Sequence, residues 1–177
     1  MPKLNSEYVV KYYNHWIEYN NENCLYIQME YCSDNLKSLI NEKAQLFNTD
    51  NEKQISIIDY FISSQMFKEL IEGLNYLHSY KNERGEPKPI IHRDLKPENI
   101  LFTEYPTNGV FLKICDFGLS RYLSSGSQTM SRDVGTLKYN APEKDSGKYT
   151  TKVDIYSLGL IGGKLFGLEK YENYIFL

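Results

Sequence analysis

Three short motifs in the second half of the chain constrain its fold and chemistry more than any other feature. The run His92-Arg93-Asp94-Leu95-Lys96-Pro97-Glu98-Asn99 comes first, Asp116-Phe117-Gly118 begins seventeen residues after Asn99, and Ala141-Pro142-Glu143 follows. The first two motifs bring carboxylates, an amide and an ammonium group into loops. Such groups hold metal ions and stabilise negative charge that develops during a reaction.

The composition of the chain limits the classes of function. The hydrophobic content of 41% in 177 residues suits one domain with a core. The formal net charge of −3 gives no overall basic field for nucleic acid or an anionic membrane surface. Cys24, Cys32 and Cys115 are scattered, which favours reduced thiols. Without a signal peptide or a run of roughly 18 apolar residues, we expect a cytoplasmic or nuclear protein, with no nucleic-acid or membrane binding evident in this segment.

The first half of the sequence predicts a hairpin and two helices. Residues 8–18 and 25–29 are rich in Val, Ile, Tyr and Trp and flank a polar segment, which indicates a β-hairpin. Residues 33–35 can cap a short helix, and the polar residues 41–54 predict a loop. A long amphipathic helix is expected next, with a buried apolar stripe at three- and four-residue intervals. The stripe comprises Ile57, Ile58, Phe61, Met66, Phe67, Leu70, Ile71, Leu74 and Leu77.

The second half is expected to contain more loop. Residues 81–89 include a glycine and two prolines, so the long helix must end before them. Short strands at 100–103 and 110–115 flank a turn at 106–109. A last helix is expected to begin near Lys152, weakened towards its far end by Gly162, Gly163 and Gly167.

In order and spacing the three motifs resemble the signature of eukaryotic-type protein kinases. The resemblance implies an α+β, two-lobed fold, here incomplete, and transfer of the gamma-phosphoryl group of ATP to a protein hydroxyl with Mg²⁺ as cofactor. Residues 1–32 would be the end of the small lobe and the hinge. Residues 33–177 would be the large lobe up to its central helix.

The resemblance assigns roles to residues of the first two motifs. Asp94 would orient the substrate hydroxyl or accept its proton, and Lys96 would neutralise charge on the transferred phosphoryl group. Asn99 and Asp116 would be oxygen ligands of Mg²⁺. Lys96 also favours Ser/Thr specificity, with dual specificity left open.

Residues before these motifs resemble the adenine-binding hinge of the same family. Met29 would be the gatekeeper, the backbone of Glu30 and Cys32 would hydrogen-bond adenine, and Leu101 would form the floor beneath it. An apolar slot with a few backbone polar groups is the usual form of such a site.

Other residues would have structural or regulatory roles by the same resemblance. Asp154 would be buried and would bind the backbone of the catalytic loop, and His92 and Phe117 would pack together. Phosphorylation at Ser131 or Thr129 could order the loop through Arg93.

Residues 27–32, 9–18 and 135–139 resemble the kinases of the alpha subunit of translation initiation factor 2, which suggests that subunit as a substrate. The spacing between the hairpin strands is shorter than in many of those kinases.

The sequence contains no glycine-rich phosphate loop and no Lys in a Val-Ala-Ile-Lys context. We therefore expect exposed apolar surface and negligible phosphate transfer by the 177 residues alone. Three interpretations stay open: a fragment of an active kinase, a pseudokinase or truncated nucleotide-binding or scaffold module, and an inert truncated product.

Overall fold

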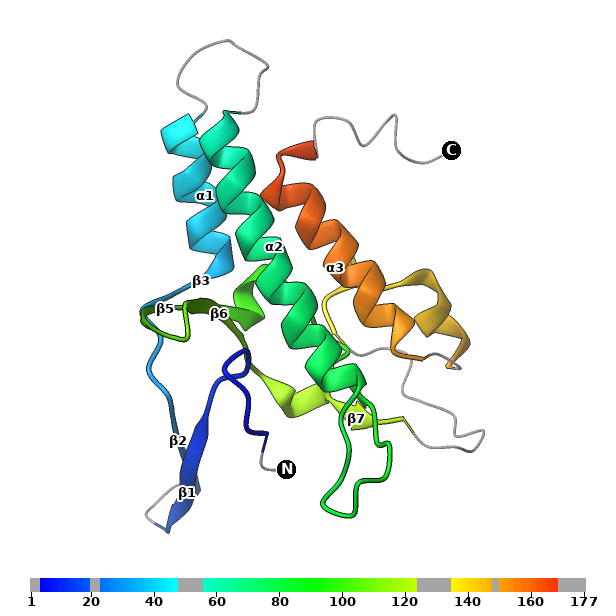
Figure 1. Cartoon of the computed structure of the whole chain (residues 1–177). Coiled ribbons are helices and arrows are strands. Elements are labelled where there is room, and N and C mark those ends of the chain that lie inside the picture. The colour runs from blue at the N-terminus through cyan, green and yellow to red at the C-terminus, as the bar shows by residue number, and fades with distance from the viewer. Residues whose placement is uncertain (1–3, 20–22, 48–55, 124–134, 148–149, 169–177) are drawn as a thin grey trace.

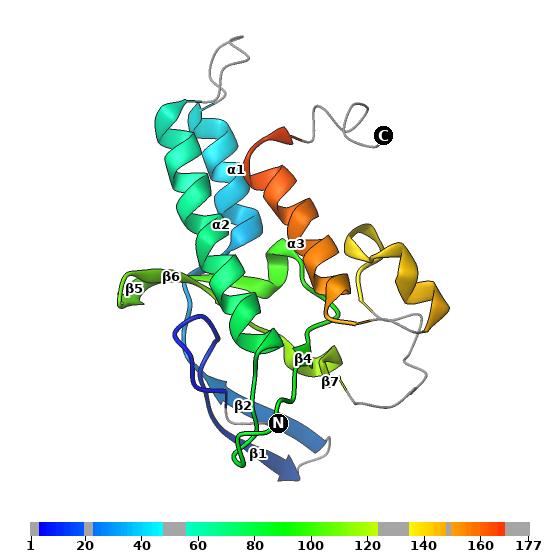
Figure 2. The ribbon, with the colours of Figure 1, turned by 45° about the vertical axis from the view of Figure 1, so that its right-hand side comes forward.

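The computed structural model describes residues 4–19, 23–47, 56–123, 135–147 and 150–168. Within them, three α-helices lie side by side: α1 (Leu36–Phe47), α2 (Ile57–His78) and α3 (Lys152–Leu165) (Figure 1). A two-stranded hairpin projects from one end of this helical body, as Figures 1 and 2 both show. The arrangement is the α+β fold that the sequence predicts.

A small antiparallel sheet packs against α2. Its strands lie in the order β3 (Asp34–Asn35), β5 (Ile100–Thr107) and β6 (Val110–Ile114). Between β5 and β6 the chain reverses through Asn108 (φ 53°) and Gly109 (φ 76°), both in the left-handed region that a two-residue hairpin turn requires. The predicted turn is confirmed and is shorter than expected.

The long predicted helix is confirmed as α2. The Ser56 hydroxyl caps its first turn by accepting a hydrogen bond from the Ile58 N–H at 3.3 Å. In its second half, Glu69 Oε2 accepts hydrogen bonds from the N–H groups of Phe111 and Leu112 in β6, at 2.9 and 2.8 Å. This contact fixes α2 against the sheet.

The predicted buried stripe of α2 is only partly right. Leu70, Leu74 and Leu77 are buried, in the half of the helix that faces β6. Four other residues of the stripe stay exposed: Ile57, Ile58, Phe61 and Ile71. Burial therefore depends on where the sheet and α3 meet the helix, which the periodicity of one segment cannot show.

The prediction of a loop at residues 41–54 is wrong for its first part. Helix α1 continues to Phe47, and residues 48–55 lie outside the described part of the chain. Lys43 stabilises the extra turns, because its ammonium lies between α2 and α3. It pairs with Asp59 Oδ1 at 2.5 Å, donates to the Ser63 hydroxyl at 2.8 Å and contacts the carbonyl of Leu165. These tertiary contacts outweigh the polar character of the segment.

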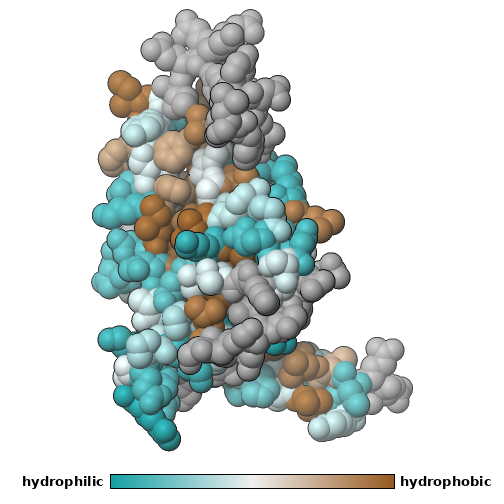
Figure 3. Space-filling model, turned by 90° about the vertical axis from the view of Figure 1, so that its right-hand side faces the viewer, coloured by the Kyte–Doolittle hydropathy of each residue, from teal (hydrophilic) through white to brown (hydrophobic). Residues whose placement is uncertain are grey.

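The predicted hairpin forms as β1 (Tyr12–Tyr19) and β2 (Asn23–Met29), paired antiparallel. Every residue of both strands is exposed, and the rings of Trp16 and Tyr26 stack with their centroids 5.3 Å apart. Hydrophobic residues cover much of the hairpin where it stands away from the body (Figure 3). The expected exposed apolar surface is therefore present here.

Helix α3 begins at Lys152 as predicted and continues through two of the three weakening glycines. Close packing explains why position 162 is a glycine, because a Cβ atom there would lie 2.7 Å from Cε2 of Phe67 on α2. Gly167 follows the end of the helix with a φ of 65°, a common position for a glycine. No helix among the described residues is long and apolar enough to span a membrane.

Candidate active site

The loop that begins at His92 lies between β4 (Ile90–Ile91) and β5, and Asp154 of α3 holds its backbone. Asp154 Oδ2 accepts a hydrogen bond from the His92 N–H at 2.8 Å, and Oδ1 accepts one from the Arg93 N–H at 2.9 Å. His78 Nε2 on α2 lies 2.9 Å from the same carboxylate. Asp154 is buried, so its predicted structural role is confirmed.

Arg93 has an unusual backbone conformation. Its φ of 71° lies in the left-handed region, which costs a non-glycine residue about 1–3 kcal/mol. Its side chain turns towards the second motif, where Nε donates to the carbonyl of Leu119. The predicted phosphorylation sites Thr129 and Ser131 lie outside the described residues, so their pairing with Arg93 stays a prediction.

The carboxylate of Asp94 is surrounded by hydrogen-bond donors. Oδ1 accepts from the N–H of Thr136 at 2.8 Å and from its hydroxyl at 2.9 Å. Oδ2 accepts from Asn99 Nδ2 at 3.1 Å and pairs with Lys96 Nζ at 3.0 Å. Lys96 Nζ also donates to the Thr136 hydroxyl at 2.8 Å. Three predicted site residues, Asp94, Lys96 and Asn99, thus share one network with Thr136.

This network keeps Asp94 ionised. Burial by itself raises the pKa of the Asp94 carboxyl, but hydrogen bonds from Lys96 and Thr136 and the charge of Lys96 outweigh burial and lower that pKa. A carboxylate with a lowered pKa is a weak base. The arrangement therefore suits orientation of a hydroxyl group better than full removal of its proton.

Asn99 and Asp116, the predicted metal ligands, come from loops that the backbone ties together. The carbonyl of Asn99 accepts a hydrogen bond from the Cys115 N–H at 3.0 Å, which places Asp116 beside the first motif. Asn99 Nδ2 donates to both the carbonyl and Oδ2 of Asp94, so its amide oxygen points away from Asp94. Asp116 is exposed. Amide and carboxylate oxygens are the donor types that Mg²⁺ prefers, so these two residues fit the ion.

The predicted contact between His92 and Phe117 is present. The ring centroids lie 5.2 Å apart, and His92 Nε2 lies 2.8 Å from the carbonyl oxygen of Cys115. His92 is buried. It serves as packing and as a link between the two motifs, as the sequence suggested.

Some polar groups of the predicted hinge residues already form hydrogen bonds and ion pairs within the chain. The Glu30 N–H donates to the carbonyl of Lys11 at 2.8 Å, and its carboxylate pairs with the buried Lys113 at 3.1 Å. Of the Glu30 backbone, only the carbonyl is left for adenine. Leu101 is half-buried in β5 and pairs with Asn35, just beyond the hinge. Met29 is 49% exposed in this structure.

The sequence does not predict the roles of two residues near the site. Thr136 lies in a segment that carries only a family resemblance, although it supplies two of the donors to Asp94. Lys113 links the hinge to β6 and also donates to the carbonyl of Glu7 at 2.9 Å. Both contacts join segments far apart in sequence, so neither spacing nor periodicity signals them.

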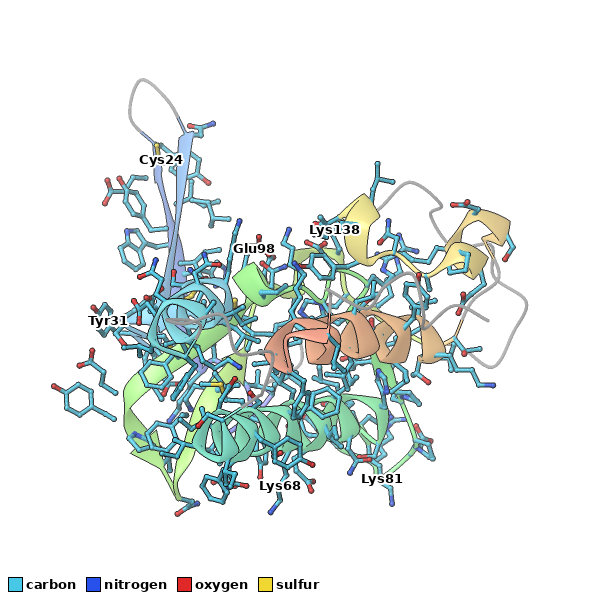
Figure 4. All side chains as sticks on the ribbon, turned by 90° about the horizontal axis from the view of Figure 1, so that it is seen from above. Cys24, Tyr31, Lys68, Lys81, Glu98 and Lys138 are labelled. Carbon is cyan, nitrogen blue, oxygen red and sulfur yellow. The ribbon has the colours of Figure 1, made fainter. Side chains whose placement is uncertain are left out.

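A cavity of about 240 Å³ lies beside this network. Thr136 forms part of its wall, together with Pro97 and Glu98 of the first motif. Three lysines also line it: Lys37, Lys138 and Lys164. Glu98 and Lys138 lie on the same side of the molecule, opposite Lys68 and Lys81 of the α2 side (Figure 4). Through Thr136, the cavity adjoins the network around Asp94.

Comparison with protein families identifies relatives of this arrangement. The family model described as "Protein kinase domain" matches residues 1–172. The chain is 31% identical over 179 residues to the mouse "Interferon-induced, double-stranded RNA-activated protein kinase". The match covers 93% of this chain and 31% of that protein. The predicted resemblance to kinases of this group is thereby confirmed.

Other similar proteins are protein kinases of different kinds. A MAP kinase kinase of Schizosaccharomyces pombe is 39% identical over 158 residues, covering 88% of this chain and 37% of that protein. A probable serine/threonine-protein kinase of Dictyostelium discoideum is 39% identical over 118 residues, covering 66% of this chain and 10% of that protein. The chain thus spans only a minor part of each of these relatives.

Proposed function

Because this chain belongs to the protein kinase family, and by family is a protein Ser/Thr kinase, we propose that it transfers the gamma-phosphoryl group of ATP to a serine or threonine hydroxyl of a protein. The observation that carries the proposal is the network at Asp94. An ionised carboxylate with four donors around it is fixed in position, and phosphoryl transfer depends mainly on positioning and charge stabilisation.

Each residue of the network has a definite task in this proposal. Asp94 accepts a hydrogen bond from the substrate hydroxyl and directs its oxygen for attack. Lys96 lies within 3.0 Å of Asp94, so its ammonium can neutralise charge that develops on the transferred group. Thr136 holds both residues, which keeps the acceptor and the cation at a constant distance from each other.

Asn99 and Asp116 would hold Mg²⁺. When bound, the ion neutralises negative charge on the phosphates of ATP. The amide nitrogen of Asn99 is fixed by Asp94, so its oxygen is oriented before any ion binds. Adenine would lie against Met29, the backbone of Glu30 and Cys32, and Leu101.

The protein substrate would approach through the cavity beside Thr136. We propose the alpha subunit of translation initiation factor 2 as one substrate, supported by the resemblance of residues 27–32 and 135–139 and by the mouse relative. The three free thiols support a cytoplasmic location.

Transfer of labelled phosphate from ATP to that subunit tests the proposal. The 177 residues contain no glycine-rich loop, so the assay uses the chain alone and the chain fused behind the small lobe of the mouse relative. We expect Mg²⁺-dependent phosphoserine or phosphothreonine from the fusion and little from the chain alone. ATP binding without transfer by a folded fusion would favour the pseudokinase or scaffold alternative instead.

A further inference from the structure

Lys144 is a buried cation that the proposed mechanism does not use. It lies in the short 3-10 helix Pro142–Ser146, directly after the Ala141-Pro142-Glu143 motif, and is only 2% exposed. A lysine is almost never buried to this degree without partners. Its environment therefore indicates what its ammonium group holds.

Lys144 donates hydrogen bonds to the catalytic loop and to the segment before the third motif. Its Nζ donates to the carbonyl oxygen of Arg93 at 2.8 Å and to Oδ1 of Asn140 at 2.6 Å. The Arg93 carbonyl belongs to the peptide unit whose N–H is that of Asp94. Lys144 is thus one peptide group away from the residue that would orient the substrate.

The backbone of Arg93 needs support because of its conformation. Arg93 has a φ of 71°, and Asp154 holds its N–H from one side at 2.9 Å. Lys144 holds its carbonyl from the other side. The Asp154 carboxylate thus binds the N–H of Arg93 and the Lys144 ammonium binds its carbonyl. These two contacts fix the orientation of the Arg93 backbone.

Gly135 shows how closely this arrangement is packed. A Cβ atom at Gly135 would lie 2.5 Å from the Arg93 carbonyl oxygen and 3.0 Å from both Lys144 Nζ and Asn140 Oδ1. The next residue, Thr136, donates to Asp94. Gly135 therefore packs closely against the Arg93 carbonyl and Lys144, directly before the residue that donates to Asp94.

The pKa of the Lys144 ammonium is lowered from its usual value. Burial is the main influence and lowers the pKa of its ammonium, while the carboxylates of Asp154 and Asp94 act in the opposite direction and Arg93 adds to the lowering. These are the charged groups that act on it from the catalytic loop and from α3. The ammonium thus has two acidic neighbours that favour its charged form.

We propose that Lys144 is a positioning residue. By binding the Arg93 carbonyl it sets the orientation of the Arg93–Asp94 peptide, and so keeps the Asp94 carboxylate within hydrogen-bond distance of Thr136. Its effect on catalysis rests on the proposed kinase function. Its effect on the position of Asp94 does not, because that can be measured on the chain without any reaction.

The test compares Lys144→Met with Lys152→Met in the isotope-labelled chain. Methionine keeps the length and apolar stem of lysine and removes the donor, and Lys152 is an exposed lysine at the start of α3. We expect Lys144→Met to move the amide resonances of Asp94 and Thr136, whereas Lys152→Met leaves both unchanged. A folded Lys144→Met protein with both resonances unchanged would overturn the proposal, even if it melted at a lower temperature.

Two more variants make the result decisive. Asn140→Ala removes a second acceptor of Lys144 and should leave the Asp94 resonance in place. An equal displacement in Asn140→Ala and Lys144→Met would show a general packing effect and contradict the proposal. If Lys144→Met does not fold, Lys144→Gln replaces it, because its shorter neutral amide should leave the Arg93 carbonyl without its donor. Unmoved Asp94 and Thr136 resonances in Lys144→Gln would then refute the role.

Kinetics give the second readout. In a fusion that transfers phosphate, Lys144→Met should lower kcat by about tenfold to a hundredfold, the loss expected for a misplaced group, with little change in the KM of the protein substrate. If the unmodified fusion transfers no phosphate, the proposed function fails. The resonances of Asp94 and Thr136 would still decide the role of Lys144.

Discussion

The Arg93 N–H donates a hydrogen bond of 2.9 Å to Oδ1 of Asp154, across 61 residues of sequence. The same carboxylate accepts the His92 N–H, so one buried side chain satisfies two backbone donors that precede Asp94. The position of the proposed catalytic residue therefore depends on a buried residue of α3.

Asp154→Asn should lower the free energy of unfolding by about 2–4 kcal/mol, because an amide has one acceptor oxygen for two donors and leaves a buried group unpaired. Urea unfolding of both proteins at neutral pH measures the change. Asp145→Asn is the control, since Asp145 is exposed in the 3-10 helix after the third motif, and its effect should stay below about 0.5 kcal/mol. Equal effects of the two substitutions would contradict the structural role of Asp154.

Gly135→Ala should destabilise the chain more than Gly85→Ala. Both glycines have a positive φ, 90° and 76°, which costs an alanine about 1–2 kcal/mol. Only at Gly135 would the new Cβ meet other atoms, with the Arg93 carbonyl at 2.5 Å and nothing within 4 Å at Gly85. The clash should add about 1–3 kcal/mol. Thermal and urea unfolding of both variants measure the difference, and a Gly135→Ala protein as stable as Gly85→Ala would show that the two loops are not packed as described.

The cysteines should differ in their reaction with iodoacetamide. Burial, and then the charge of Asp116, raise the pKa of the Cys115 thiol to about 12, so very little thiolate forms near neutral pH. Cys24 is exposed near the far end of the hairpin (Figure 4). Mass spectrometry of the folded chain should show alkylation of Cys24 long before Cys115, and the difference should vanish in urea. Equally fast alkylation of both thiols in the folded chain would contradict the burial of Cys115.

Stability should fall in acid partly through Asp94. Because the pKa of this carboxyl is lower in the folded chain than in the unfolded chain, its contribution is complete above the unfolded pKa and is lost as the pH falls through the folded pKa. The loss should occur below about pH 4. Urea unfolding at several acidic pH values should show a shallower pH dependence for Asp94→Asn than for the unmodified chain. Parallel pH dependences would mean that Lys96 and Thr136 do not hold the carboxylate.

The sequence predicts well the features that depend on neighbouring residues. The hairpin, α2, the start of α3 and the turn at Asn108-Gly109 all have local signals, and the structure contains each of them. Asp154 could be predicted because its motif has a known partner in the family. Its hydrogen bonds to His92 and Arg93 confirm that inference.

The features that escaped prediction depend on contacts between distant segments. The loop expected after residue 40 is helical to Phe47, because Lys43 finds partners on α2 and α3. Ile57, Ile58 and Phe61 fit the periodicity of a buried face and are exposed nonetheless. Lys144 looks like a surface charge in the sequence and is buried against the Arg93 carbonyl. No local pattern encodes which segment will lie opposite such residues.

The most direct test of the proposed function compares Asp94→Asn with Glu83→Gln in the fusion with a small lobe. Both substitutions exchange a carboxylate for an amide, but Glu83 is exposed in the segment after α2 and does not line the cavity beside Thr136. With labelled ATP, Mg²⁺ and the alpha subunit of initiation factor 2, we expect Asp94→Asn to lower the rate of phosphate transfer by at least about a hundredfold, and Glu83→Gln to lower it far less. Transfer by Asp94→Asn at the unmodified rate, in a fusion that remains folded, would contradict the assignment of Asp94 as the residue that orients the substrate hydroxyl.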